Sequence, residues 1–316
     1  MIRYLTTEDK KVLELDHISR AHWIHVQPPY NREELEAFAN NLDIPLDFFY
    51  DSLDIDERSR YEREDNCKLI LINTPMLANS SKDNEAFYKT VPIGIILTDD
   101  YIITVCSVEN PIITKFLESK VKGFDPQDKE LFTLQIFEQN VIRFLDCLKK
   151  LNLRRHLIEE ELYNSSRNRE LQQLLKIEKS LVYFVNSLSA NELLMMKMKR
   201  TDLLKIREKE LHFDLFEDAI IDNSQALEMS NVYTNILSGT MEAYASIVSN
   251  NMNAFIQRLT IITIILMVPT LVASFYGMNL VHLPFSESPY AFYILILLSF
   301  GLGVLIIWFF RRIGNS

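Results

Sequence analysis

Long stretches of this chain lack the residues that usually end helices. From residue 127 to residue 268 there is no proline and only one glycine, Gly239. Apolar residues recur there at helical spacing, as in Leu134, Phe137, Val141 and Phe144. The absence of helix breakers excludes a succession of short strands and turns in this part of the chain, and long helices are the natural interpretation.

Charge is missing from two further stretches near the carboxyl end. Residues 259–275 and residues 290–310 contain no Asp, Glu, Lys or Arg. At about 1.5 Å rise per residue, the second stretch is roughly 31 Å long, enough to cross the hydrocarbon core of a bilayer. The first is shorter, but residues 253–258 can extend its helix into the interface. The sequence therefore predicts a membrane hairpin.

Cysteine is scarce, and several functional motifs are missing altogether. Cys67, Cys106 and Cys147 show no CxxC spacing, so we expect reduced thiols in the cytosol. The amino terminus lacks a long apolar run, so no cleaved signal peptide is expected. A net charge of −10 argues against a nucleic-acid partner. The sequence contains no GxxxxGK[ST] motif and no defensible catalytic group, so we expect no ATP-driven step and no enzyme activity.

The distribution of basic residues predicts an orientation. Residues 280–289, between the apolar stretches, contain no Lys or Arg, whereas Arg311 and Arg312 follow the second stretch directly. The positive-inside rule then puts both ends of the chain in the cytoplasm and the linker outside. We expect a multi-pass protein of the cell membrane, with bilayer lipid as one of its partners.

The first 126 residues have a different character, with seven prolines and short apolar runs. Asp99-Asp100 favours a hairpin turn, and Asn31 with Glu34 forms a capping box at the start of a helix. An α/β domain is the expected fold here. Its predicted strands are residues 12–15, 23–26, 68–74, 93–98 and 101–105.

The helical half divides at two predicted breaks, near residues 164–168 and 200–206. The third helix would run from about residue 207 to 278 without a stop signal before the membrane. A helix of that length indicates a stalk bundled with copies of itself. The expected organisation is a cytoplasmic α/β domain at 1–125, paired long antiparallel helices at 126–206, a stalk helix at 207–254, a pore-lining span at 255–279, an extracytoplasmic loop at 280–289, a second span at 290–310 and a basic cytoplasmic tail at 311–316.

A polar stripe follows the first apolar stretch at steps of three and four residues. This repeat keeps one face of a helix toward a shared axis. Hydroxyls and amides on such a face in hydrocarbon indicate a wet axis, although small polar residues can also mediate tight helix packing without a pore. The stripe consists of Asn253, Ile256, Thr260, Thr263, Met267, Thr270 and Ser274.

At its end the first span carries Tyr276-Gly277-Met278-Asn279. With a second span and a basic tail behind it, this segment resembles the signature of the CorA family of divalent-cation transporters. The resemblance extends to Val248-Ser249-Asn250, Trp23-Ile24 and Ile44-Pro45-Leu46, and covers essentially the whole chain. It implies a CorA-like homopentamer with an α/β cytoplasmic domain, a long-helix stalk and two C-terminal transmembrane helices, the first lining the pore.

The same resemblance implies roles for individual residues. Asp51 and Asp218 match acidic positions that bind regulatory Mg²⁺ between subunits, and Asp222 shares the helix face of Asp218. At the outer mouth the match is weaker, because Glu287 lies two residues beyond the position where the family carries its glutamate. Whether Glu287 forms an outer acidic ring stays open. The implied pore residues are the filter Gly277, Met278 and Asn279, the entrance Asn253, the gate positions Ile256, Leu259 and Met267, and the polar position Thr270.

Together these features predict a channel that imports Mg²⁺, with Co²⁺ and Ni²⁺ as further candidates and Mg²⁺ also as a regulatory ligand. Neutral amide oxygens suit an ion that gives up its inner waters reluctantly. No organic cofactor is expected. A zinc transporter of the same superfamily and a non-conducting membrane-anchored scaffold or sensor remain as alternatives, and coupling to protons stays open.

Overall fold

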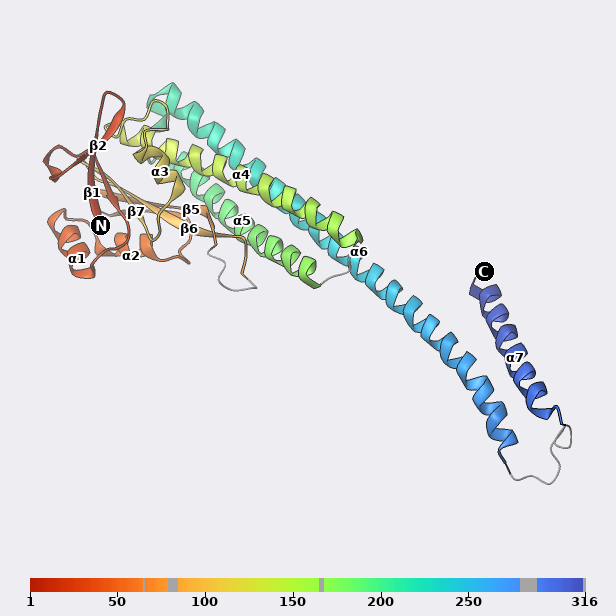
Figure 1. Cartoon of the computed structure of the whole chain (residues 1–316). Coiled ribbons are helices and arrows are strands. Elements are labelled where there is room, and N and C mark those ends of the chain that lie inside the picture. The colour runs from red at the N-terminus through yellow and green to blue at the C-terminus, as the bar shows by residue number, and fades with distance from the viewer. Residues whose placement is uncertain (65, 79–84, 165–167, 279–288, 315–316) are drawn as a thin grey trace. The chain divides into compact units, whose positions relative to one another are not determined.

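We describe a computed structural model of the chain, which covers residues 1–316 except 65, 79–84, 165–167, 279–288 and 315–316. The chain forms two compact units, Met1–Gly239 and Thr240–Ser316. The first unit is a sheet with helices on both faces (Figure 1). The second consists of the end of one long helix and a further helix.

The sheet has seven strands in the order β2-β1-β3-β7-β6-β5-β4. Strands β3 and β7 pair in parallel, and all other neighbours are antiparallel. All five predicted strands are confirmed within a few residues, and the Asp99-Asp100 turn joins an antiparallel pair. Strands β1 and β4 are additional. The bounds are β1 Ile2–Glu8, β2 Lys11–Leu15, β3 Trp23–Val26, β4 Arg60–Glu64, β5 Cys67–Leu77, β6 Tyr88–Leu97 and β7 Ile102–Cys106.

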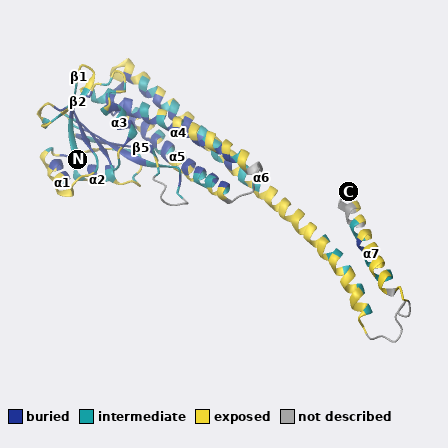
Figure 2. Cartoon of the chain, viewed as in Figure 1, coloured by how far each residue is buried: buried dark blue, intermediate teal, exposed yellow. Residues whose placement is uncertain are grey.

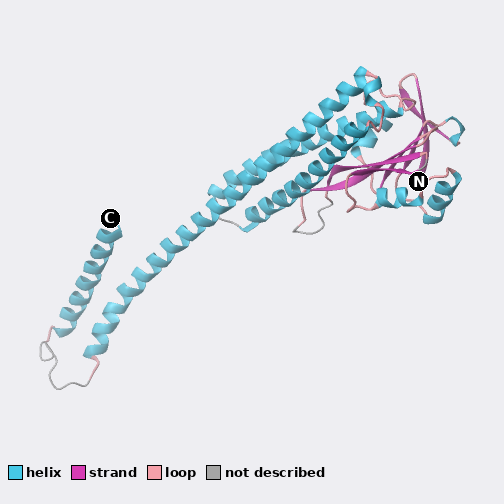
Figure 3. Ribbon diagram, turned by 180° about the vertical axis from the view of Figure 1, so that it is seen from behind, coloured by secondary structure: helices cyan, strands magenta, loops and turns pink. Residues whose placement is uncertain are grey.

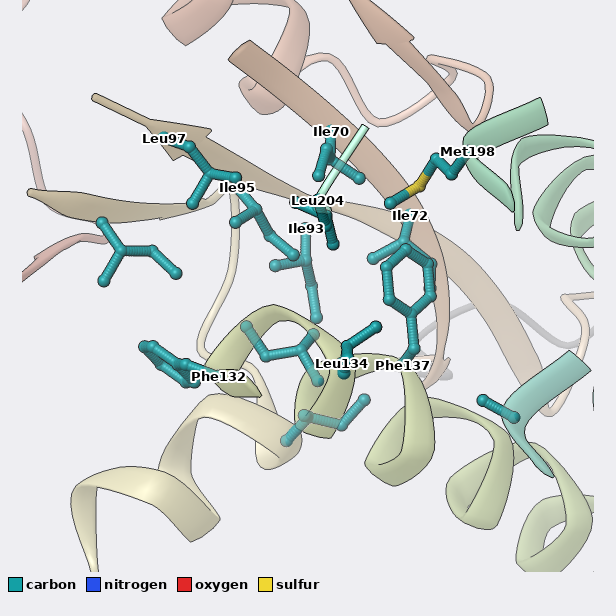
Figure 4. Close-up of a cluster of buried hydrophobic side chains, with 14 of the residues drawn as sticks. Ile70, Ile72, Ile93, Ile95, Leu97, Phe132, Leu134, Phe137, Met198 and Leu204 are labelled. Atoms are coloured by element: carbon teal, nitrogen blue, oxygen red, sulfur yellow. The ribbon is translucent and has the colours of Figure 1, made fainter. Parts of the chain in front are cut away.

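Alternation along the central strands builds a core on each face of the sheet. In β5, Ile70 and Ile72 join the core under the long helices, whereas Leu69 and Leu71 join the core under α1 and α2. Successive strand side chains point to opposite faces, so a strand buried on both sides reads as a continuous apolar run. Figure 4 shows the first of these cores, where Phe132 and Phe137 approach the sheet.

Two short helices, α1 (Arg32–Asn41) and α2 (Leu46–Leu53), cover one face of the sheet. The Asn31 half of the predicted capping box is confirmed, because Asn31 Oδ1 accepts a hydrogen bond of 3.2 Å from the Glu33 amide. Helix α2 lies so close to β6 that a Cβ added at Gly94 would overlap the side chain of Ser52. Glycine is therefore required at that crossing. The remaining short elements are α3 (Pro111–Leu117) and the 3-10 turns Ile18–Arg20 and Ile206–Glu208.

The long helices are α4 (Lys129–Asn164), α5 (Asn168–Thr201) and α6 (Glu210–Tyr276), followed by α7 (Ala291–Gly314). The predicted break near residues 200–206 is confirmed, whereas the one near residues 164–168 falls on residues 165–167, which lie outside the described residues. Helices α4 and α5 pack on the second face of the sheet (Figure 3) and share its core, so both belong to the same compact unit as the α/β part. Helix α6 contains 67 residues and ends two residues before the predicted limit.

Helix α6 buries one face within the first unit. Its Phe216 ring lies 6.0 Å from that of Phe137 on α4, and Asn223 Nδ2 donates to the Leu188 carbonyl on α5 at 3.0 Å. The buried positions recur every three or four residues, so the opposite face of the helix remains exposed. They are His212, Phe216, Ala219, Asn223, Ala226, Ser230 and Leu237.

Beyond the point where β5 pairs with β4, buried asparagine side chains form hydrogen bonds with the backbone of β5. The Asn73 amide donates to Asn191 Oδ1 at 3.1 Å, and the Asn73 carbonyl accepts from Asn191 Nδ2 at 2.9 Å and Asn140 Nδ2 at 3.0 Å. Helices α4 and α5 thus satisfy backbone groups that an edge strand would expose. This network ties both helices to the sheet.

Candidate functional site

The predicted polar stripe lies on the part of α6 that belongs to the second unit. Every one of its positions is exposed in the chain, as Figure 2 shows along this half of the helix. Even the apolar members Ile256 and Met267 have exposed fractions of 52% and 58%. Since the helix is regular from Glu210 to Tyr276, the three- and four-residue steps put these side chains on one face.

The threonine hydroxyls on this face are already oriented by the helix. Thr260, Thr263 and Thr270 each donate a 2.9 Å hydrogen bond to the carbonyl four residues earlier. The donors are therefore satisfied within the helix, while the hydroxyl oxygens keep acceptor capacity. Water molecules around a cation present their hydrogens outward, so such oxygens can accept from a hydrated ion.

Proline interrupts the backbone hydrogen-bond pattern beside the predicted gate. Pro269 lies inside α6 and has no amide hydrogen, so the carbonyl of Ile265 loses its usual helical donor. The Thr270 hydroxyl bonds to the next carbonyl, that of Leu266. The backbone is thus locally weakened next to Met267, although the helix continues through this point to Tyr276.

Helix α6 ends just before the first residues of the predicted filter, whose amides bond to its last carbonyls. The Gly277 amide donates to the carbonyls of Ala273 and Ser274 at 2.9 and 3.2 Å, and the Met278 amide donates to that of Phe275 at 3.3 Å. A Cβ at Gly277 would make ordinary contacts, 3.4 and 3.5 Å from those two oxygens. Within the described chain, local packing therefore does not demand glycine. Asn279 and Glu287 lie outside the described residues.

By length and composition, one helix in the described part of the chain can cross a membrane. This is α6, whose most apolar window has a mean hydropathy of 2.1 and is not buried. The apolar stretch Phe292–Trp308 of α7 is shorter within the described residues. The first predicted span is therefore supported, and the second stays a prediction.

The predicted regulatory carboxylates lie on different elements. Asp218 is exposed and Asp222 half-buried on α6, whereas Asp51 lies on α2. Neither Asp218 nor Asp222 forms an ion pair with another described residue. Among the described residues no group of three His, Cys, Asp or Glu side chains could hold a metal ion.

Asp51 already has a cation beside it. Arg60 on β4 donates to the Asp51 carboxylate at 2.7 Å, and also to Glu57 at 2.6 Å and Glu62 at 3.0 Å. Burial opposes the charge of Arg60, but the bonds to these carboxylates outweigh it and raise the guanidinium pKa. A divalent ion at Asp51 would have to share the carboxylate with Arg60. The sequence analysis did not identify this pairing.

A second cluster that the sequence analysis missed anchors the start of α6. Asp128 accepts from the Leu131 amide at 2.9 Å at the start of α4, and its other oxygen lies 2.7 Å from Lys209 Nζ and 3.3 Å from His212 Nε2. Burial tends to raise the pKa of Asp128, but the bond to Lys209 outweighs it and the pKa is lowered. The anchor therefore stabilises the fold above the ordinary pKa of aspartate, and is lost as pH falls through the lowered value.

Known proteins resemble this chain over nearly its full length. A cobalt/magnesium transport protein CorA from Methanocaldococcus jannaschii is 27% identical over 97% of both chains. Another of that name, from Thermotoga maritima, is 20% identical over 98% of this chain and 87% of its own. The solved CorA magnesium transporter of M. jannaschii has a TM-score of 0.79 at 23% identity, covering 99% of this chain and 98% of that one.

At these low identities, the structural likeness establishes the fold. A full-length CmaX structure shares it with a TM-score of 0.71 at 16% identity. The profile of a family described as CorA-like Mg²⁺ transporter protein matches residues 19–312, nearly the whole chain. The chain therefore belongs to the family of CorA-like Mg²⁺ transporter proteins.

Proposed function

We propose that this protein is a homo-oligomeric channel that lets Mg²⁺, and with it Co²⁺ and Ni²⁺, enter the cell, with the exposed stripe of α6 lining the pore. The observation that carries this proposal is the unbroken run of exposed stripe positions from Asn253 to Ser274. The hydroxyl oxygens of this face keep acceptor capacity that lipid cannot use and that a water-filled axis can. A non-conducting scaffold would not need a hydroxyl-bearing face at this depth.

The chemistry of the stripe fits a weakly held, hydrated ion. Its polar members offer neutral oxygens and no carboxylate, so they can accept hydrogen bonds from the waters of Mg²⁺ without binding the ion tightly. Gly277, Met278 and Asn279 would form the selective ring at the outer end. An inside-negative potential contributes roughly 4.6 kcal/mol per 100 mV for a divalent ion, which is sufficient to drive entry.

Flux measurements test this function directly. The purified full-length chain, reconstituted in liposomes, should conduct Mg²⁺ under an imposed inside-negative potential, with Co²⁺, Ni²⁺ and Zn²⁺ compared side by side. A preference for Zn²⁺ that depends on a pH gradient would instead support the zinc-transporter alternative. Assembled protein without flux of any of the four ions would support the scaffold or sensor.

Met267 provides a test of the pore face. Met267→Asp should wet a constriction that excludes water by its apolar surface, and raise ion leak in the same liposomes several-fold. Met267→Leu keeps an apolar side chain of similar volume and is the matched control. Equal conductance of wild type and both variants would mean that this face of α6 does not border the ion path.

Regulation by Mg²⁺ forms a further part of the proposal. Carboxylates of Asp51 and Asp218 from neighbouring copies, with Asp222 nearby, would repel one another, so the closed arrangement should hold a divalent cation between them. High internal Mg²⁺ would then favour closure. Because Arg60 already neutralises part of the charge at Asp51, Asp218 should contribute more of the Mg²⁺ effect than Asp51.

Limited proteolysis measures this effect. Millimolar Mg²⁺ should slow cleavage of the full-length protein by chymotrypsin, chosen because an introduced lysine would create a site for trypsin. Asp218→Lys should remove most of the protection, and Asp51→Lys a smaller part. If wild type shows no Mg²⁺-dependent protection, or if both variants keep it in full, these residues are not the sensor.

A further inference from the structure

One arginine is shared by three carboxylates beside α2. Arg60 lies on β4 directly opposite Leu71, whose side chain belongs to the core under α1 and α2, so Arg60 points to the same face of the sheet. Its Nη2 donates to Asp51 Oδ2 at 2.7 Å. Its Nη1 and Nε donate to Glu57 Oε1 at 2.6 Å and to Glu62 Oε1 at 3.0 Å. Each of the three nitrogens thus serves a different carboxylate.

The position of Asp51 on α2 makes a cation beside it favourable. Asp51 lies in the last turn of this helix, where the helix dipole is negative and repels a carboxylate. The side chains of Asp51 and Arg60 are 29% and 30% exposed, so water screens their charges only in part. Three carboxylates against one guanidinium leave the cluster negatively charged, and a divalent cation is still attracted to it.

Arg60 can release Asp51 without losing its other partners. Only Nη2 bonds to Asp51, whereas Nη1 and Nε are held by Glu57 and Glu62. In the described part of the chain, Asp51 Oδ1 accepts no hydrogen bond, so one oxygen of this carboxylate is left for the water shell of an ion. The arginine therefore weakens the binding of a cation to Asp51 without blocking the carboxylate.

We propose that Arg60 is a tethered cation that competes with Mg²⁺ for the Asp51 carboxylate and thereby sets the Mg²⁺ concentration at which the protein closes. A positive charge held beside a carboxylate repels a second cation that approaches it. Because Arg60 belongs to the same chain as Asp51, its local concentration is fixed while that of Mg²⁺ varies. The inference rests on the regulatory part of the proposed function and does not depend on conduction.

A purely structural role for Arg60 leads to different expectations. A guanidinium that only fastens β4 to α2 would change the thermal stability of the protein and leave its response to Mg²⁺ unaltered. Two substitutions separate these roles. Arg60→Gln keeps N–H donors for the carboxylates but removes the charge, whereas Arg60→Lys keeps the charge and loses the planar arrangement of donors.

A Mg²⁺ titration of chymotrypsin cleavage, made on the full-length protein, measures the competition. Arg60→Gln should lower the Mg²⁺ concentration for half-maximal protection about tenfold, and Arg60→Lys should stay within about twofold of wild type. The control is Arg63→Gln, which removes the same charge from an exposed position of β4 that forms no described bond to Asp51. Melting without Mg²⁺, followed by circular dichroism, reports the structural effect of each variant separately.

The effect of Arg60 must depend on the Asp51 carboxylate. Adding Asp51→Asn to Arg60→Gln should bring the half-maximal Mg²⁺ concentration back to the wild-type value or above it. If the lowered value persists without this carboxylate, or if Arg63→Gln shifts it as far, Arg60 does not act through Asp51 and the proposal is overturned. Equal values for wild type and Arg60→Gln would also contradict it.

The same titration separates this inference from the proposed function. Wild type without Mg²⁺-dependent protection would remove the proposed regulation. If Arg60→Gln then gains protection at millimolar Mg²⁺, Arg60 fills the site at Asp51 in the wild type, in support of the competition. Absence of protection from both proteins would overturn the competition as well. Ion flux through the same preparations decides independently whether the protein conducts.

Discussion

Replacement of Asn279 by alanine is expected to abolish selective Mg²⁺ uptake while the oligomer stays assembled. The proposed ring of amide oxygens at the mouth of the pore holds the ion through its waters, and alanine removes these acceptors without adding bulk. The change should lower uptake into liposomes by at least tenfold, because the hydrated ion then has no hydrogen-bond acceptor at the outer end of the pore.

Size-exclusion chromatography with light scattering shows whether the variant is still assembled. Asn231→Ala is the matched control, since Asn231 is an exposed amide on α6 and lies outside the polar stripe. Uptake at the wild-type rate by an assembled Asn279→Ala protein would remove the basis for the filter assignment. A loss of assembly would show instead that Asn279 acts in holding the copies together.

Gly94→Ala is expected to destabilise the first unit strongly, because β6 and α2 leave no room for a methyl group at this position. A Cβ at this position of β6 would occupy the space of the Ser52 side chain, which is itself buried and bonded to the Phe48 carbonyl at 2.6 Å. Overpacking of a rigid helix–sheet contact costs about 3 kcal/mol. The melting temperature of the first unit should fall by about 10 °C.

Thermal unfolding of the full-length protein, followed by circular dichroism, measures this change. Gly239→Ala is the control, because a Cβ there meets no atom within 4 Å and alanine favours the helix by about 1 kcal/mol. Ser52→Gly in the Gly94→Ala background should recover part of the loss by removing the overlapping atoms. If Gly94→Ala melts like wild type, α2 is free to move away from the sheet.

Much of the fold follows from local sequence patterns. The strands β3, β5, β6 and β7 are rich in aliphatic and aromatic residues, and the long helices have no proline before Pro269. Strand β4 was missed because Arg60-Tyr61-Glu62-Arg63-Glu64 is dominated by charge. Its position at the edge of the sheet leaves much of it exposed, so burial does not impose an apolar pattern.

The order of the strands could not be read from local patterns. The parallel pairing of β3 with β7 joins residues about eighty positions apart, and no turn between them fixes the register. The Asn73–Asn191 bonds likewise depend on where α5 returns to the sheet. Such contacts are specified by the packing of the complete core and not by any single segment.

In the candidate site, too, local patterns predicted some features, whereas contacts between distant segments were not predicted. The polar stripe could be predicted because the period of a helix is fixed, so spacing alone selects one face. The Asp51–Arg60 pair and the Asp128 anchor join different elements and became visible only in three dimensions. A surface groove that Leu193 and Met196 of α5 line likewise includes Arg207, which precedes α6.

The absence of lysine and arginine between Glu210 and Gln257 also determines how this helix behaves in mass spectrometry. Trypsin cuts after Lys209 and next after Arg258, so Asp218, Asp222 and Asn253 emerge together in one long acidic peptide. That peptide contains no native cysteine. A disulfide formed through a cysteine introduced at residue 218 would therefore join this peptide to one other fragment, and the mass of the pair would identify both partners in a single digest.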